Sequence, residues 1–193
     1  MRKSKVETAK TRERIVKAAG AEFAANGITE AALARVMAAA GLTHGGFYRH
    51  FASKDQLVAE ACSKTLLSLI AGLESRISGR SPEKALPLLL DIYVSRAHRN
   101  QPRTGCPLAA LGSELARKDK KTRDTATEGF LRLSRLIASQ LENVPFRDRE
   151  ARSMAIVAAM VGAVTLARIV PDSRISDSVL TGTRDYIVQS VRR

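Results

Sequence analysis

The segment LTHGGFYRHF, residues 42–51, follows a short apolar stretch and determines how the rest of the chain is interpreted. The spacing of Leu33, Val36 and Met37 upstream predicts a short helix with one apolar face. Gly41 then stands where a residue without Cβ can take the positive φ of a tight turn. A second short helix over residues 42–51 would complete a helix-turn-helix.

The residue types in this second helix suit a surface laid against a DNA duplex. Gly45 and Gly46 each cost roughly 1 kcal/mol of helix propensity relative to alanine, but they let the backbone approach base edges closely. Exposed amides at a helix N-terminus favour anions. Side chains able to donate to phosphates or bases surround the glycines: Thr43, His44, Tyr48, Arg49 and His50. We therefore predict a DNA-recognition helix; the alternative is an ordinary amphipathic helix with a solvated polar face.

Residues 8–57 resemble the N-terminal domain of the tetracycline-repressor (TetR) family of bacterial transcription regulators. The resemblance covers about a quarter of the chain and departs from the family at Val36-Met37, where an isoleucine-alanine pair is commoner. It implies an all-helical homodimer in which Tyr48, His50 and Lys54 contact phosphates, while Thr43, His44, Gly45 and Gly46 face the bases. The matching residues are Arg14, Ile15, Ala18, Ala19, Phe23, Gly27, Ala40, Gly41, Leu42, Phe47, Tyr48, Arg49, His50, Phe51, Ser53, Lys54, Asp55 and Leu57.

The other helices of this domain have recognisable ends. We expect a first helix over residues 7–26 that stops at Gly27, and a second that Thr29 opens as its N-cap. Arg35 projects from the polar side of the second helix and is a further phosphate candidate. Ser53 and Gln56 have the spacing of a capping box, which predicts the start of a long helix over residues 54–77.

The N-terminus carries a basic run that contains no apolar residue before Val6. We expect residues 1–6 to form a flexible basic arm in which Lys3 and Lys5 contact the minor groove or phosphates. An untethered tail is the alternative.

Composition agrees with an all-α protein in which residues 1–55 form the DNA-binding domain. The 193-residue chain has no tryptophan, 4% aromatic residues and a net charge of +13, which favours polyanionic partners. The charge is distributed as +5 over residues 1–55 and +8 over the remainder, so part of it is a solvated surface. No apolar run approaches the roughly 20 residues of a membrane span and no secretory leader is apparent, so we expect a cytoplasmic protein without a membrane partner.

Residues 56–193 are expected to form a larger helical domain for effector binding and dimerisation. Helices are predicted over residues 81–99, from 107, and over 122–141, 148–169 and 177–191. The long helix over 54–77 would join the two domains, either as a lever that a ligand tilts or as a static connector. The last two helices carry small and apolar residues that would form a four-helix bundle across a two-fold axis. The dimerisation candidates are Met154, Ala158, Val161, Gly162, Thr165, Tyr186 and Ile187.

Effector candidates are fewer and less specific. Tyr93, Arg96 and His98 are expected to line a ligand cavity or, alternatively, to lie at an exposed helix end. Cys106 is expected at a helix N-terminus, where amide dipoles lower a thiol pKa. The stretch GCPL-x2-LGSELA also resembles one in a subset of TetR-family regulators, some of which respond to reactive compounds. Buried packing is the alternative for Cys106, and packing is expected for Cys62.

No catalytic or cofactor motif emerges from the sequence. The three histidines lack metal-pair spacing, the two cysteines form neither a zinc motif nor a disulfide framework, and there is no phosphate-binding loop. We expect a non-enzymatic regulator without cofactor or metal: a repressor that binds a palindromic double-stranded operator as a homodimer and releases it on binding a small molecule. The alternatives are a redox or electrophile sensor acting through Cys106, and a general basic nucleic-acid binder without an effector.

Overall fold

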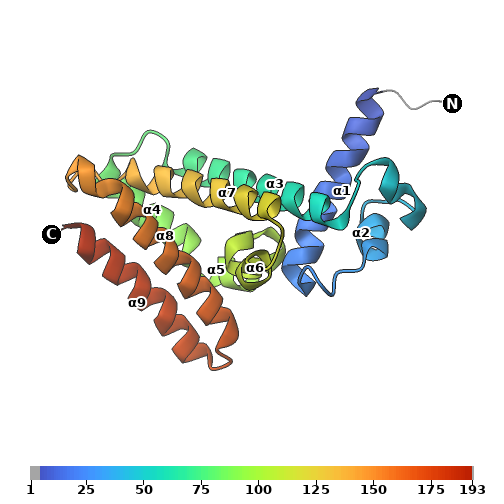
Figure 1. Ribbon diagram of the computed structural model, residues 1–193. Helices are drawn as coiled ribbons and strands as arrows, with labels where there is room; N and C mark the ends of the chain where they lie inside the picture. The colour runs from blue at the N-terminus through green and yellow to red at the C-terminus, as the bar shows by residue number, and fades with distance from the viewer. Residues whose placement is uncertain (1–4, 193) are drawn as a thin grey trace. The chain divides into compact units, whose positions relative to one another are not determined.

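The computed structural model describes residues 5–192, with the side chains of residues 5–191, and these residues form helices joined by short links without any β-strand (Figure 1). The predicted all-α class is thereby confirmed. The chain divides into two compact units. Unit 1 comprises the described part of residues 1–66 together with residues 102–126, and unit 2 comprises residues 67–101 and the described part of 127–193.

Unit 1 is built around the first helix of the chain. Its elements are α1 (Lys5–Asn26), α2 (Leu33–Ala39), the 3-10 helices η1 (His44–Arg49) and η2 (Pro102–Thr104), α6 (Pro107–Leu115), and the first parts of α3 (Lys54–Ile77) and α7 (Lys120–Ala138). Helix α1 packs against α2, η2 and α6. The apolar core is completely or almost completely buried and includes Ile15, Ala19, Phe23, Val36, Met37, Phe47, Phe51 and Leu57. Burial of this apolar surface holds the short elements in place.

Two glycines set the turns that the sequence predicted. Gly27 has φ +80° and ends α1, and Gly41 has φ +71° in the turn between α2 and η1. Residues with a side chain rarely adopt such values. The helix-turn-helix connection is therefore fixed by backbone geometry as well as by the core.

Three expectations about helix starts are wrong. Helix α1 begins at Lys5, so Lys5 and Val6 belong to a helix and not to an arm, while Lys3 lies outside the described residues. Helix α2 begins at Leu33, and its N-cap Ala32 lies three residues after the predicted cap Thr29. The predicted recognition helix over 42–51 is a 3-10 helix of six residues, η1. The low α-helix propensity of its two consecutive glycines accounts for this difference.

Unit 2 contains the remaining helices. They are the second parts of α3 and α7, then α4 (Pro82–Tyr93), α5 (Arg96–Asn100), α8 (Phe146–Ile169) and α9 (Ser173–Arg192). Helices α8 and α9 lie side by side, and α9 also packs against α4 (Figure 1). The buried side chains include Leu86, Leu89, Leu90, Tyr93, Leu133, Ile137, Val157, Met160, Val164 and Ile187.

The helix predicted over 81–99 is two helices. Helix α4 ends at Tyr93, and Ser95 caps α5 because its Oγ accepts the amide of His98 at 3.1 Å. Helix α7 is displaced from the predicted range 122–141, since Asp119 accepts the amide of Thr122 at 2.7 Å and starts the helix earlier. Helix α9 also begins before residue 177, because Asp172 Oδ1 accepts the amides of Arg174 and Ile175 at 2.8 and 3.0 Å.

Helices α3 and α8 are long and apolar enough to span a membrane by length and composition, with mean hydropathies of 1.2 and 1.5. The expectation that no stretch approaches such a span is thus wrong on composition. Both helices nevertheless bury one face in the protein: Leu57, Leu66 and Leu73 of α3, and Val157 and Val164 of α8, are inaccessible or nearly so. This pattern is ordinary for core helices of a soluble protein.

Candidate nucleic-acid interface

The η1 segment is seated on the core of unit 1 by two aromatic rings. Phe47 and Phe51 are buried and stacked, with ring centroids 5.6 Å apart and an interplanar angle of 22°. The Arg12 guanidinium lies 4.1 Å from the centroid of the Phe51 ring, donates to the His50 carbonyl and pairs with the Glu60 carboxylate. These contacts join α1 and α3 to the end of η1, so its exposed residues are presented on a well-supported element.

The outer side of η1 gathers most of the predicted DNA-binding residues. Thr43, His44, Gly45, Tyr48 and Arg49 are exposed, Tyr48 to 73%, and His50 is half-buried. Thr43 occupies the N-cap position but makes no side-chain cap hydrogen bond. Its hydroxyl is thus not committed to capping η1.

The two glycines of η1 are not required by packing among the described residues. A Cβ on Gly45 would meet no atom within 4 Å, and one on Gly46 would lie 3.6 Å from Met37 Cε, an ordinary contact. Neither glycine has a positive φ. Neither position therefore requires glycine to avoid a steric clash or to allow a positive φ.

Lys54 and Arg35 have partners inside the protein. The Lys54 ammonium donates to the carbonyls of Thr29 at 3.3 Å and Ala31 at 2.9 Å, and partial burial together with the charge of Lys118 lowers the pKa of Lys54. Arg35 pairs with Glu22 at 2.8 Å and donates to the Glu30 carbonyl. Both cations lie next to the link between α1 and α2.

Sequence reasoning missed Glu114, on α6. Its Oε1 accepts the amide of Ile28 at 3.1 Å, and its Oε2 accepts the amide and the hydroxyl of Thr29 at 2.9 and 3.1 Å. Partial burial opposes ionisation of Glu114, but the hydrogen bonds from Thr29 and Ile28 and the charge of Lys118 outweigh it and lower the pKa of the carboxyl. A contact across 85 residues leaves no local signal in the sequence.

Two of the effector candidates of unit 2, Tyr93 and His98, are in contact with each other. Tyr93 is buried, its ring meets that of His98 edge to face with centroids 4.6 Å apart, and its carbonyl lies 2.7 Å from His98 Nδ1. Burial, with the nearby charge of Arg168, lowers the pKa of His98 although its hydrogen bond to the Tyr93 carbonyl acts in the opposite direction. His98 is half-buried, so it does not lie at a fully exposed helix end.

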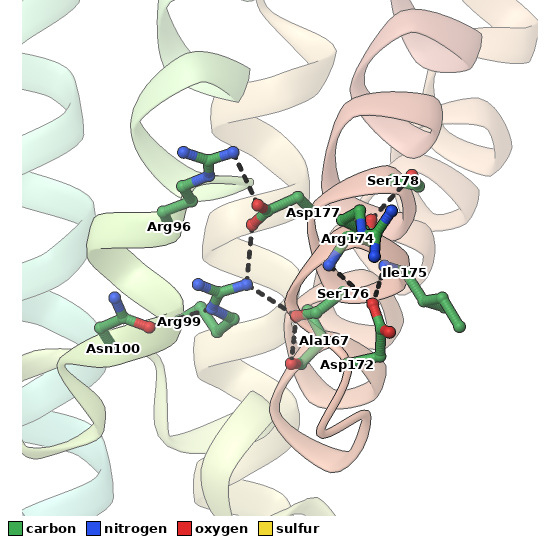
Figure 2. Close-up of polar contacts among 10 residues, drawn as sticks. All are labelled: Arg96, Arg99, Asn100, Ala167, Asp172, Arg174, Ile175, Ser176, Asp177 and Ser178. Carbon is green, nitrogen blue, oxygen red and sulfur yellow. Dashed lines mark hydrogen bonds and ion pairs between the residues drawn. The ribbon is translucent and has the colours of Figure 1, made fainter.

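Arg96 belongs to a polar network that joins α5 to α9 (Figure 2). The Asp177 carboxylate forms ion pairs with the guanidinium groups of Arg96, at 2.6 Å, and of Arg99, at 2.9 Å. Arg99 also donates a hydrogen bond to Ser176 Oγ at 2.7 Å. Arg96 and Asp177 line an open cavity of about 290 Å³ with Asp91 and Arg184. Tyr93 and His98 are absent from its lining.

Cys106 occupies the N-cap position of α6, as predicted, but its side chain is completely buried. Cys62 is also buried, and burial together with the neighbouring Cys106 raises the pKa of the Cys62 thiol to about 12. Among the described residues, neither cysteine forms a disulfide bond. Reactive cysteines are accessible and easily ionised, so these surroundings resemble those of packing residues.

The outward face of α8 and α9 carries most of the predicted dimerisation residues. Ala158 is exposed, Tyr186 is 71% exposed, and Leu166, Ile169 and Ile175 add further exposed apolar surface. Met154, Val161, Gly162 and Thr165 are half-buried. Ile187 is only 2% exposed, so its assignment to the outward face is wrong: its position on α9 turns it into the core of unit 2.

Among residues 5–192, no group of three or more potential ligands is placed to hold a metal ion.

Known proteins resemble this chain in both its parts. The family description "Bacterial regulatory proteins, tetR family" matches residues 15–61, and "Transcriptional regulator LmrA/YxaF-like, C-terminal domain" matches residues 82–177. The HTH-type transcriptional regulator AcrR of Shigella flexneri is 32% identical over 93 residues, which is 48% of this chain and 43% of that regulator. The probable acrEF/envCD operon repressor of Escherichia coli K12 is 37% identical over 59 residues, 31% of this chain and 27% of that repressor. The chain thus aligns with less than half the length of these curated relatives.

Solved structures match along nearly the whole chain. A TetR transcriptional regulator from Chloroflexus aurantiacus has a TM-score of 0.75 at 27% identity, covering 95% of this chain and 96% of its own. A TetR-family regulator from Cytophaga hutchinsonii has a TM-score of 0.80 at 19% identity, covering 97% and 98%. The reduced form of E. coli NemR has a TM-score of 0.75 at 17% identity, covering 91% and 96%. The last two comparisons concern the fold alone.

Proposed function

Because this chain belongs to the TetR family of bacterial transcription regulators, we propose that it is a repressor that binds a palindromic operator as a homodimer and releases it on binding a small molecule. The observation that carries the DNA-binding part is the exposed surface of η1. Gly45 there is exposed and open, Gly46 is half-buried beside Met37, and the rings of Phe47 and Phe51 are buried. Since packing does not require glycine at these positions, their lack of side chains is best explained by a duplex that approaches the backbone closely.

The proposed contacts follow from where the side chains lie. Thr43, His44, Gly45 and Gly46 would face base edges, and the exposed Tyr48 and Arg49, with His50, would reach phosphates. Lys54 uses its ammonium on two carbonyls, which leaves one of its three N–H groups for a phosphate. Arg35 and Lys5 are secondary phosphate candidates, and Lys3 stays a prediction from sequence.

The homodimer is supported by the outward face of α8 and α9. An exposed surface with Leu166, Ile169, Ile175 and Tyr186 is costly for an isolated subunit in water. A second copy turned about a two-fold axis would cover it with the same face. Two copies of η1 would then be available for the two halves of a palindrome.

Release by a small molecule requires that the ligand bind the DNA-incompetent conformation more tightly than the competent one. Helix α3 begins in unit 1 and ends in unit 2, so it provides one covalent route between the proposed DNA-binding and effector-binding parts. Unit 2 would hold the effector; Arg96 at the open cavity is its best-placed polar candidate, with Tyr93 and His98 nearby in sequence. We propose a cytoplasmic protein without enzymatic activity.

The alternative function, a redox or electrophile sensor acting through Cys106, receives no support because that side chain is completely buried. A general basic binder would be distinguished by the absence of sequence preference. The direct test is selection of bound duplexes from a pool of randomised 30-base-pair DNA by the full-length protein. The proposal expects a palindromic consensus; recovery of unrelated sequences would favour the general binder.

A further inference from the structure

The link between α1 and α2 is held from two sides by charged residues of other helices. Glu114 of α6 accepts the two consecutive backbone amides of Ile28 and Thr29 and the Thr29 hydroxyl. Lys54 of α3 donates to the carbonyls of Thr29 and Ala31. Donors of the link therefore face a carboxylate, and its acceptors face an ammonium.

The position of Glu114 depends on the absence of a side chain at Gly27. A Cβ at Gly27 would lie 2.8 Å from Glu114 Oε1, and the φ of +80° already disfavours one. Gly27 thus ends α1 and also makes room for a carboxylate 87 positions later in the chain. Ile28 and Ala31, on either side of Thr29, are completely buried, so the link itself is packed down against unit 1.

The link is the element that leads directly into the helix-turn-helix. Helix α2 starts at Leu33 without a side-chain N-cap, and η1 follows after the Gly41 turn. A hydrogen bond to a charged group contributes more net stability than one between two neutral groups. The orientation of α2 and η1 is therefore supported at its start by Glu114 and not by a local capping residue.

A second contact between the same segments reinforces this arrangement. Lys118, one turn after Glu114, pairs with Asp55 at the start of α3 at 3.1 Å. The carboxylate of Glu114 and the ammonium of Lys118 are thus both directed to the residues that flank the helix-turn-helix. The segment 102–126 and residues up to 66 form one compact unit, as these contacts would require.

We propose that Glu114 is a positioning residue for DNA recognition: through Ile28 and Thr29 it sets the orientation in which α2 and η1 meet the operator, although it makes no DNA contact itself. This inference rests on the proposed DNA-binding function. It places a residue of α6, far beyond the predicted DNA-binding domain of residues 1–55, among the determinants of operator affinity.

The test compares full-length Glu114→Ala, Glu114→Gln and Thr29→Val with the wild type on two duplexes: the operator selected by the wild type and a random duplex of equal length. Glu128→Ala is the matched control, since Glu128 is an exposed helical glutamate that pairs with Arg132 on its own helix. Measurements are made at 15 °C, where circular dichroism verifies that each variant is folded.

We expect Glu114→Ala to weaken operator binding by about tenfold, with affinity for the random duplex unchanged within about twofold. The dependence of affinity on salt concentration should keep its slope, because Glu114 neutralises no phosphate. Glu114→Gln retains one acceptor oxygen and should fall between Ala and wild type, and Glu128→Ala should match the wild type.

Wild-type operator affinity in folded Glu114→Ala, or an equal loss on both duplexes, would overturn the proposal and leave Glu114 a purely structural residue. If Glu114→Ala does not fold, the same two criteria are applied to Glu114→Gln and Thr29→Val, with an expected selective loss of about threefold. Failure of the wild type to select any operator would instead contradict the proposed function.

Discussion

At the scale of single residues, Gly45 and Tyr48 show how exposure separates a binding role from a packing role. Gly45 has open space where its side chain would be, and Tyr48 is 73% exposed while its neighbour Phe47 is completely buried. The sequence alone placed these residues on one short segment. The family resemblance already implied that Tyr48 contacts phosphates, and the structure shows that its ring is exposed while the Phe47 ring packs in the core.

Gly45→Leu should weaken operator binding by at least about 100-fold, or ~2.7 kcal/mol, because the leucine side chain would separate the backbone of η1 from the base edges. The melting temperature should stay close to that of the wild type, since the added atoms meet open space. Gly72→Leu is the matched control: Gly72 is also exposed and open, on α3 in unit 2. Loss of folding in Gly45→Leu would assign the glycine to packing instead.

Lys54→Ala tests whether the third N–H of the ammonium reaches a phosphate. We expect weaker binding to all duplexes and a plot of log affinity against log salt that is shallower by roughly one unit. Titrations at four salt concentrations measure this slope. An unchanged slope with reduced affinity would restrict Lys54 to its two hydrogen bonds with the α1–α2 link.

At the scale of elements, a helix boundary could be predicted from the sequence where the hydrogen bonds that set it are local. Helix α3 begins at Lys54 and ends at Ile77 as predicted. Its start is set by Ser53, whose Oγ accepts the amide of Gln56 at 3.0 Å. The Gln56 side chain accepts the amide of Ala52, next to Ser53, and so completes a close variant of the capping box. Local spacing was sufficient here.

Helix α2 shows the opposite case. Thr29 has the residue type of an N-cap, but its amide and hydroxyl bind a carboxylate 85 positions away, and the helix starts three residues later than predicted. The break between Tyr93 and Arg96 was missed because apolar periodicity continues through a Ser95 cap. Tertiary contacts of this kind cannot be derived from propensity.

Helix α5 should give unit 2 a pH-dependent stability through His98. Its pKa is lowered in the folded protein, so below about 6.5 the unfolded chain binds a proton that the folded chain does not. Stability should therefore decrease as the pH falls from 7.5 through 6.5 toward the folded pKa. His98→Gln should reduce this decrease, measured by urea unfolding at pH 7.5 and 5.5; an identical decrease in both proteins would contradict the assignment.

At the scale of the whole molecule, recognition of a palindrome as we propose it requires two copies of the chain. The exposed face of α8 and α9 holds apolar side chains from both helices, while the buried Ile187 shows that the opposite side of α9 faces its own core. The sequence predicted an association surface on the two helices but could not assign each residue to the inner or outer side. Alternation of small and apolar residues all round α8 leaves no clear polar face to orient it.

Ala158→Arg places a cation on this face and should raise the dimer dissociation constant by about 100-fold, because the charge would be buried without a partner. Ala71→Arg is the matched control on an exposed position of α3 in the same unit. Sedimentation velocity over a concentration series measures both. A dimer that tolerates Ala158→Arg would place the interface elsewhere.

The central claim is that η1 recognises a specific duplex when two chains bind together. The most direct measurement is a titration of the selected operator and of a random duplex, with the mass of each complex determined in the same samples. We expect two chains per palindrome and an affinity for the operator at least about 1,000-fold above that for random DNA at physiological salt. Equal affinities, or a single chain bound with full specificity, would contradict it.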